Sequence, residues 1–91
     1  MTVRVKLFAH FRDLFQGRER SVAVGEGATV GDALSLLCDT SERRREIFAG
    51  EDLRPHLVVM VNGVHVRSLQ GLATPLAPGD TIAVSPILGG G

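Results

Sequence analysis

The chain ends in SPILGGG, and its last group, the carboxylate of Gly91, is the first candidate for chemistry. Three consecutive glycines bring no charge, no cap and no apolar side chain, so they cannot complete a hydrophobic core. Residues 87–91 are therefore predicted to form a flexible tail beyond a folded domain of residues 1–86. This composition indicates that the reactive group acts outside the fold.

The thiol and the imidazoles are predicted to be structural. Cys38 is the single cysteine and falls among apolar residues at helical spacing, which favours a small core side chain. A role as a reactive thiol would require exposure and a lowered pKa. His10, His56 and His65 share no metal-ligand spacing with one another or with Cys38, so no metal site is expected.

Asp80 and the arginines at 43–45 are predicted to be structural as well. Gly79-Asp80 directly precedes a β-rich segment, and an Asp at this place usually accepts backbone N–H bonds in a turn. The arginines at 43–45 stand between Glu42 and Glu46, a pattern that favours a solvated helix face with local ion pairs. Contact with an acidic partner is the alternative for this run.

The composition indicates one small soluble domain. The chain has 91 residues, 44% of them hydrophobic, with 10 Lys+Arg against 10 Asp+Glu. A formal net charge of zero gives no electrostatic reason to expect nucleic acid as a partner. No stretch is apolar enough to span a membrane or to serve as a signal peptide. We expect a cytoplasmic protein, in keeping with the single cysteine.

The first third of the chain predicts two strands and a short helix. VRVKLF (residues 3–8) alternates with the period of a strand that has one buried face. AHFRDLFQG (residues 9–17) places Phe11, Leu14 and Phe15 at helical offsets and predicts a short helix over the sheet edge. RSVAVGEG (residues 20–27) predicts a second strand that forms a hairpin with the first.

Two helices are predicted next. Thr29 and Asp32 form a weak capping box. The main helix that follows has one apolar stripe, made of Val30, Ala33, Leu34, Leu37 and Cys38. SERRREIFAGEDLRP (residues 41–55) predicts a shorter helix that runs from Ser41 to near Gly50, with its arginines toward water and with Ile47 and Phe48 turned inward.

The last third predicts a hairpin and a closing strand. LVVMVNGVHV (residues 57–66) has two β-rich runs around Asn62-Gly63, a pair that readily forms a type I′ turn. A loop rich in glycine and proline follows, and TIAVS (residues 81–85) is the closing strand before Pro86. The sequence thus predicts an α+β fold with a mixed sheet of about five strands, one main helix and short helices, compatible with the β-grasp.

The segment from Val61 to Gly91 resembles the end of the MoaD/ThiS family of ubiquitin-like sulfur carriers. The resemblance covers about the last thirty residues and supports the β-grasp fold; within the family the chain looks most like MoaD-like and CysO-type carriers. Ile87 and Gly89 stand where members commonly have a second proline and a small residue. The matching residues are Asn62, Gly63, Leu76, Gly79, Asp80, the strand at 81–85, Pro86, Gly90 and Gly91.

The resemblance implies that the chain is a substrate and not an enzyme. An activating enzyme of the MoeB/ThiF type would use ATP to adenylate the Gly91 carboxylate, and sulfur would then convert it to a thiocarboxylate. Gly89 and Gly90 would pass through narrow partner channels, since residues without a Cβ allow close approach. The chain itself is expected to bind no cofactor, because nothing in it resembles a phosphate-binding loop.

For the pathway, we expect the small subunit of molybdopterin synthase, which acts with a MoaE-like large catalytic subunit in molybdenum cofactor biosynthesis. The alternatives are a CysO-like sulfur donor in cysteine synthesis, a carrier for thiamin or tRNA thiolation, and a modifier that forms isopeptide bonds with lysines. An apolar patch near the tail would serve partner docking. Its candidate residues are Phe8, Val66, Ile82, Pro86 and Ile87.

Overall fold

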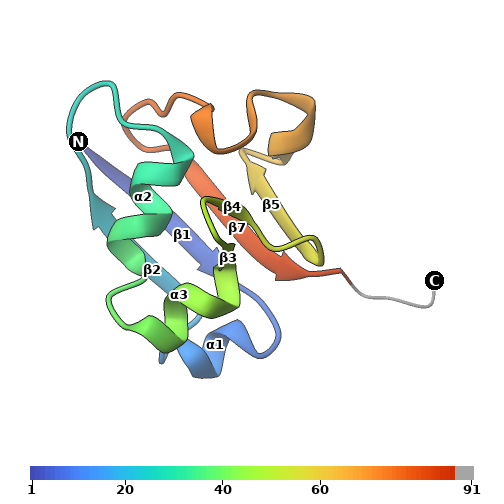
Figure 1. Ribbon diagram of the computed structural model, residues 1–91. Coiled ribbons are helices and arrows are strands. Elements are labelled where there is room, and N and C mark those ends of the chain that lie inside the picture. Colours follow the sequence, from blue (N-terminus) through green and yellow to red (C-terminus); the bar gives the residue numbers. More distant parts are fainter. Residues whose placement is uncertain (88–91) are drawn as a thin grey trace.

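The computed structural model describes residues 1–87, in which helices pack on one face of a five-stranded sheet (Figure 1). The spatial order of the sheet is β2-β1-β7-β5-β6, and a separate two-stranded ribbon pairs β3 with β4. The strands are β1 (Thr2–Leu7), β2 (Glu19–Ala23), β3 (Phe48–Ala49), β4 (Asp52–Leu53), β5 (Leu57–Val61), β6 (Val64–His65) and β7 (Thr81–Pro86). The helices are α1 (Phe11–Leu14), α2 (Val30–Leu37) and α3 (Ser41–Ile47), with the 3₁₀ turns η1 (Val66–Ser68) and η2 (Gly71–Ala73).

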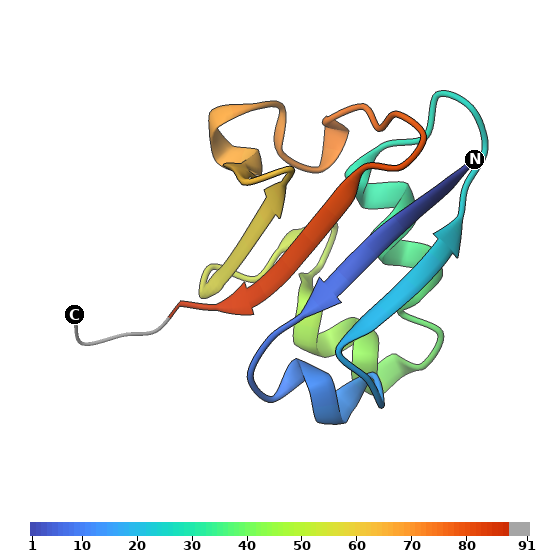
Figure 2. The same ribbon diagram turned by 180° about the vertical axis from the view of Figure 1, so that it is seen from behind.

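The sheet is mixed, as the sequence predicts. β1 pairs in parallel with β7 and antiparallel with β2, and β7 pairs antiparallel with β5. Figure 2 shows the sheet from behind, with the helices on its far side. Within residues 1–87, no helix is both long and apolar enough to cross a membrane.

The strand predicted at residues 3–8 is confirmed as β1. Its burial alternates strictly, with Val3, Val5 and Leu7 between 0 and 1% exposed. The predicted hairpin is confirmed too, and α1 forms its connection. Phe11 and Phe15 place their rings in the core from this connection, 1% and 0% exposed, and so fix the short helix against the sheet.

The main helix begins where the sequence predicts. The Asp32 backbone N–H donates to Thr29 Oγ1 at 3.3 Å, and the Thr29 N–H donates to Asp32 Oδ2 at 2.9 Å, so both halves of the capping box are present. The predicted apolar stripe is confirmed, because all five of its residues are buried. They are Val30, Ala33, Leu34, Leu37 and Cys38.

The predicted end of the second helix is wrong. α3 begins at Ser41 but ends at Ile47, not near Gly50, and the chain continues as β3. Gly50 lies in the tight turn to β4 with φ of +67°, a conformation that an α-helix does not contain. Ile47 and Phe48 do turn inward, at 0% and 7% exposed.

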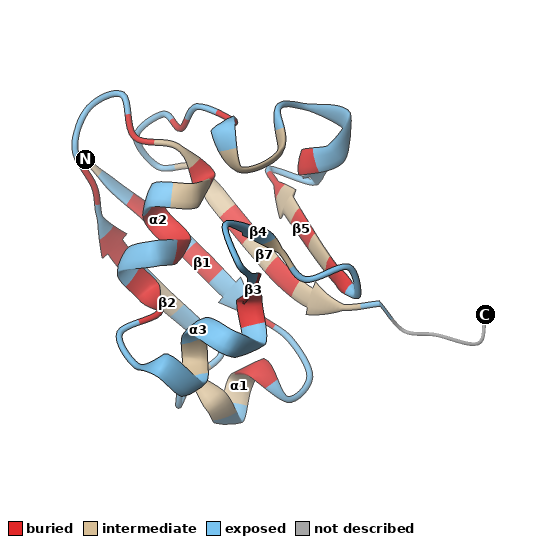
Figure 3. Ribbon diagram, in the orientation of Figure 1, coloured by how far each residue is buried: buried red, intermediate tan, exposed pale blue. Residues whose placement is uncertain are grey.

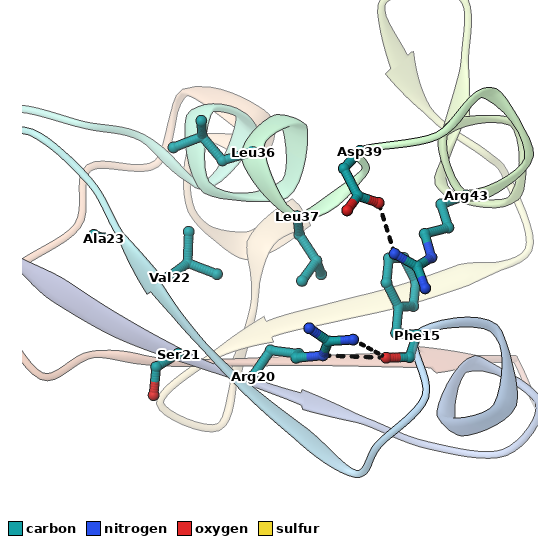
Figure 4. A pocket seen from close by; sticks show the side chains of 9 residues that line it. All are labelled: Phe15, Arg20, Ser21, Val22, Ala23, Leu36, Leu37, Asp39 and Arg43. Atoms are coloured by element: carbon teal, nitrogen blue, oxygen red, sulfur yellow. Dashed lines mark hydrogen bonds and ion pairs between the residues drawn. The ribbon is translucent and has the colours of Figure 1, made fainter.

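The expectation of a solvated arginine face is wrong for Arg43. Its side chain is 16% exposed, and its guanidinium lies 5.4 Å from the centre of the Phe15 ring. Nε donates to the Leu14 carbonyl at 3.0 Å and Nη1 to Asp39 at 2.6 Å. Figure 4 shows the bond from Arg43 to Asp39 beside the Phe15 ring, at a cavity of ≈ 260 Å³ between β2, α2 and α3, where Arg20 also donates to the Phe15 carbonyl. Arg43 therefore joins α3 to α1.

The two turns of the C-terminal third lock together at one end of the sheet. Asn62 and Gly63 both have positive φ, +50° and +83°, as a type I′ turn requires. Asn62 Nδ2 donates to Asp80 Oδ1 at 3.0 Å, and Asp80 Oδ2 accepts the Ala77 N–H at 2.8 Å. The structural role predicted for Asp80 is confirmed, and these bonds fix where β7 begins.

The core lies between the sheet and the helices. In Figure 3, buried residues recur along β1, β7 and β5 at every second position, with the helices covering that face. Ile82 and Val84 of β7 and Val59 of β5 are each 0% exposed. β7, with a strand on either side, is the centre of the sheet and carries the chain toward its last residues.

Candidate functional site

The sheet holds the chain as far as Ile87. Leu57 of β5 pairs with Pro86, and the Ile87 N–H donates to the His56 carbonyl at 2.9 Å. Ile87 was assigned to the tail from the sequence, yet its backbone is bonded to the start of β5. Gly89, Gly90 and Gly91 lie outside the described residues. The described part of the site is therefore the end of β7 and the surface around it.

An apolar patch lies beside the end of β7 on the face that the helices leave open. It surrounds a hollow of ≈ 250 Å³. The Phe8 side chain is 39% exposed there, and the other members are half-buried. We define the apolar patch by the residues that line this hollow: Phe8, Val58, Met60, Ala83 and Ser85.

Backbone pairing holds the patch together. The Phe8 N–H donates to the Val84 carbonyl at 3.1 Å, which keeps the residue after β1 beside β7. Met60 and Ala83 are register partners on β5 and β7. The Arg12 guanidinium lies 5.7 Å from the centre of the Phe8 ring and borders the patch with a positive charge. The site therefore combines a fixed apolar surface with the end of a central strand.

The structure places the predicted docking residues in two different environments. Phe8 and Ile87 are exposed, at 39% and 47%, and Pro86 is half-buried. Val66 and Ile82 are 1% and 0% exposed, so neither lies on the open face. Ile82 shares the core-facing phase of β7 with Val84. Val66 begins η1, where the chain leaves β6 and turns inward.

Three patch residues were missed by the sequence reasoning, although a signal was available. Val58 and Met60 alternate with the buried residues of LVVMV, and Ala83 alternates with those of TIAVS. A strand with one buried and one solvated face is expected to place polar residues at such positions. A run that stays apolar on both faces indicates that the second face has a partner.

The Cys38 thiol is not prepared for chemistry. It is 7% exposed at the end of α2, which confirms the predicted core position. Burial raises the pKa of Cys38 to about 11, because the thiolate would lose its hydration, and the nearby positive charge of Arg44 only partly offsets this. The thiol is therefore protonated near neutral pH and a poor nucleophile.

The histidines have ordinary contacts. His10 Nε2 lies 3.8 Å from a Glu46 carboxylate oxygen, and His65 Nδ1 accepts the Arg67 N–H. Across residues 1–87, no group of three or more His, Cys, Asp or Glu side chains is placed to hold a metal ion. The candidate site is therefore taken to be the apolar patch and the described end of β7.

Comparison with known proteins extends this picture over the whole chain. The family model described as the ThiS family matches residues 5–91. The chain is similar to small archaeal modifier protein 3 of Haloferax volcanii, with 34% identity over 92 residues and 100% coverage of both chains.

Two solved structures are similar to the fold. The chain of the Amycolatopsis orientalis BexX/CysO complex has a TM-score of 0.84 and 25% identity, with 98% of this chain and 99% of that chain covered. The putative molybdopterin converting factor subunit 1 of Pyrococcus furiosus has a TM-score of 0.76 and 31% identity, with 94% and 97% covered. These matches confirm the predicted β-grasp fold.

Proposed function

This chain belongs to the ThiS family of ubiquitin-like sulfur carrier proteins, and we propose that it carries sulfur on its Gly91 carboxylate. The observation that carries the proposal is the course of β7, which runs past the apolar patch and is bonded to the sheet up to Ile87. The point where the tail leaves the sheet is therefore fixed relative to a partner that docks on the patch.

The chemistry requires activation by another protein. A carboxylate is a poor electrophile at neutral pH, so the Gly91 oxygen attacks the α-phosphate of ATP and displaces pyrophosphate. The resulting acyl adenylate has a good leaving group, and a sulfur donor displaces AMP to give the thiocarboxylate. ATP belongs to the activating enzyme, which we propose to be of the MoeB/ThiF type. The chain is the substrate of this reaction, not its catalyst.

The apolar patch is the proposed docking surface for that enzyme. Burying apolar area contributes roughly 25 cal/mol per Å², and this offsets the cost of ordering glycines, which is about 1 to 2 kcal/mol per residue. The five patch residues bring little charge, so their burial has a small desolvation cost. Pro86 and Ile87 extend the contact from the patch to the tail.

For the sulfur acceptor, we propose a MoaE-like large subunit, with this chain as the small subunit of molybdopterin synthase. The similarity to the molybdopterin converting factor subunit of P. furiosus supports this choice. A CysO-like donor is an alternative, supported by the A. orientalis structure. Thiamin and tRNA thiolation are further alternatives.

A second function is conjugation to lysines. It is favoured by the relative from H. volcanii, which matches this chain over its full length and is named a modifier protein. The same adenylate serves both functions, because an amine can displace AMP as a sulfur nucleophile does. Lysine-linked adducts in cells would favour conjugation, and co-purification with a MoaE-like subunit would favour molybdopterin synthase.

The test is intact-mass analysis after incubation with a MoeB/ThiF-like enzyme, ATP and a sulfur source. We expect the mass change of one oxygen replaced by sulfur at Gly91. A variant with one tryptophan added after Gly91, verified as untrimmed, should show no such change, because the added bulk blocks entry into the channel. Normal sulfur loading of the extended variant would contradict the proposal.

A further inference from the structure

Lys6 is the only lysine of this chain. The other nine basic residues are arginines, whose guanidinium groups stay protonated and do not act as amine nucleophiles. The chain therefore offers two amines to an activated carboxyl group, the Lys6 side chain and the amino terminus. The structure treats these two amines differently.

The amino terminus is engaged in the sheet. The Met1 ammonium donates to the Val24 carbonyl at 2.8 Å in a partly buried position, and the Val24 N–H donates back to the Met1 carbonyl. Met1 also precedes β1, whereas the apolar patch lies beside the other end of that strand, where Lys6 pairs with Ala83 and Phe8 follows. Attack by this amine would break the bonds that hold the first residue.

Lys6 lies on the open face next to the apolar patch. Its register partner on β7 is Ala83, a patch residue, and Phe8 follows two positions along the chain. Glu19, its register partner on β2, is bonded to Arg4 at 2.7 Å instead. No ion pair within residues 1–87 includes Lys6, and its side chain is exposed. The ammonium is thus presented at the edge of the patch.

We propose that Lys6 is the acceptor when two copies of this chain are joined. The proposal rests on the proposed activation of Gly91. The deprotonated Lys6 amine of one copy attacks the Gly91 acyl adenylate of another copy. A C–N bond forms, the C–O bond to AMP breaks, AMP leaves with the bonding electrons, and the amine proton passes to solvent. The product is an isopeptide.

The position of Lys6 blocks one direction of further joining. The new isopeptide lies beside Ala83, so the attached copy covers the surface on which the activating enzyme docks. The acceptor copy keeps its own Gly91 but loses access to activation. Self-conjugates therefore cannot extend from the acceptor's Gly91, and further copies can be added only at the free Lys6 of the donor copy.

The experiment incubates the chain with a MoeB/ThiF-like enzyme and ATP, without a sulfur source. The smallest expected product has twice the mass of the chain less one water, and its branch maps to Lys6 by tandem mass spectrometry. Lys6→Arg should abolish this product while its sulfur loading, measured separately, is unchanged.

A matched variant moves the lysine without changing the count. In Lys6→Arg with Arg45→Lys, the single lysine lies on α3, exposed and on the helix side of the sheet. Its two-copy conjugate leaves the acceptor's apolar patch open, so this purified product should support ATP–pyrophosphate exchange, whereas the Lys6-linked product of the unaltered chain should not. Equal exchange by the two products would overturn the blocking step.

The remaining outcomes separate this proposal from the proposed function. If the enzyme catalyses no ATP–pyrophosphate exchange with the chain, the activation of Gly91 is wrong and this proposal falls with it. If exchange and sulfur loading are normal but the branch maps to Met1, or no conjugate forms, only the role of Lys6 is overturned.

Discussion

The two faces of the sheet both carry apolar side chains, but only one of them is covered. On the helix side, Val5, Ile82 and Val84 are each 0% exposed. On the open side, Phe8 is 39% exposed, and Met60 is half-buried beside it. Burial in the fold accounts for the first set and leaves the second unexplained. The difference supports our proposal that the same strands serve folding with one face and partner binding with the other.

The largest expected effect is on the covered face. Ile82→Ala should lower the free energy of unfolding by about 2 to 5 kcal/mol, because it leaves a cavity in the centre of the core. Chemical denaturation measures this directly. Met60→Ala, on the open face of the neighbouring strand, should cost much less. Equal losses for the two variants would contradict the division of the sheet into a folding face and a binding face.

The next effect is on the open face. Met60→Asp should reduce activation by a MoeB/ThiF-like enzyme about tenfold or more, because a docked partner would have to bury an unpaired carboxylate. ATP–pyrophosphate exchange at varied chain concentration is the measurement, and the melting temperature should stay close to that of the unaltered chain.

The control for this variant is Leu36→Asp. Leu36 is 59% exposed on α2, on the helix side of the sheet, so this substitution adds the same charge outside the apolar patch. It should leave activation unchanged. Comparable losses from both variants would mean that the added charge, and not the patch, determines the result.

A smaller effect is expected where the helices are joined over the covered face. Arg43→Ala should cost about 1 to 2 kcal/mol of unfolding free energy, because it removes the bond to the Leu14 carbonyl and the contact with the Phe15 ring. Arg45→Ala, two positions along the same helix and exposed, should stay within about 0.5 kcal/mol. Chemical denaturation measures both losses. If the two variants lose the same unfolding free energy, Arg43 does not help to hold the helices in place.

Local sequence signals predicted most of the fold. The alternation of VRVKLF, the Thr29 and Asp32 capping pair and the Asn62-Gly63 turn each depend on neighbours in the chain, and each is present. The β3–β4 ribbon was missed because strands of two residues are too short to show a period. Arg43 was misjudged because its partners Leu14 and Phe15 are distant in sequence.

The candidate site was less predictable, since it depends on which face each strand presents. Ile82 could have been excluded from the sequence, because it has the same phase in TIAVS as Val84. Val66 could not, because continuing the phase of β6 would place it with Val64, which is 45% exposed. Only the turn into η1 buries it. The patch also requires Phe8 to lie beside β7. This placement results from the parallel pairing of β1 with β7, two strands from opposite ends of the chain, which local sequence signals do not reveal.

That parallel contact has a consequence for how the protein is made. β7 follows every other element in chain order, yet it occupies the middle of the sheet between β1 and β5. While β7 is still inside the ribosome, β1 and β5 lack the strand that lies between them, so the sheet cannot form as one unit. Premature termination before residue 81 would leave a product that cannot close its sheet and is open to proteolysis. Synthesis thus couples the completion of the fold to the completion of the end that we propose to carry the chemistry.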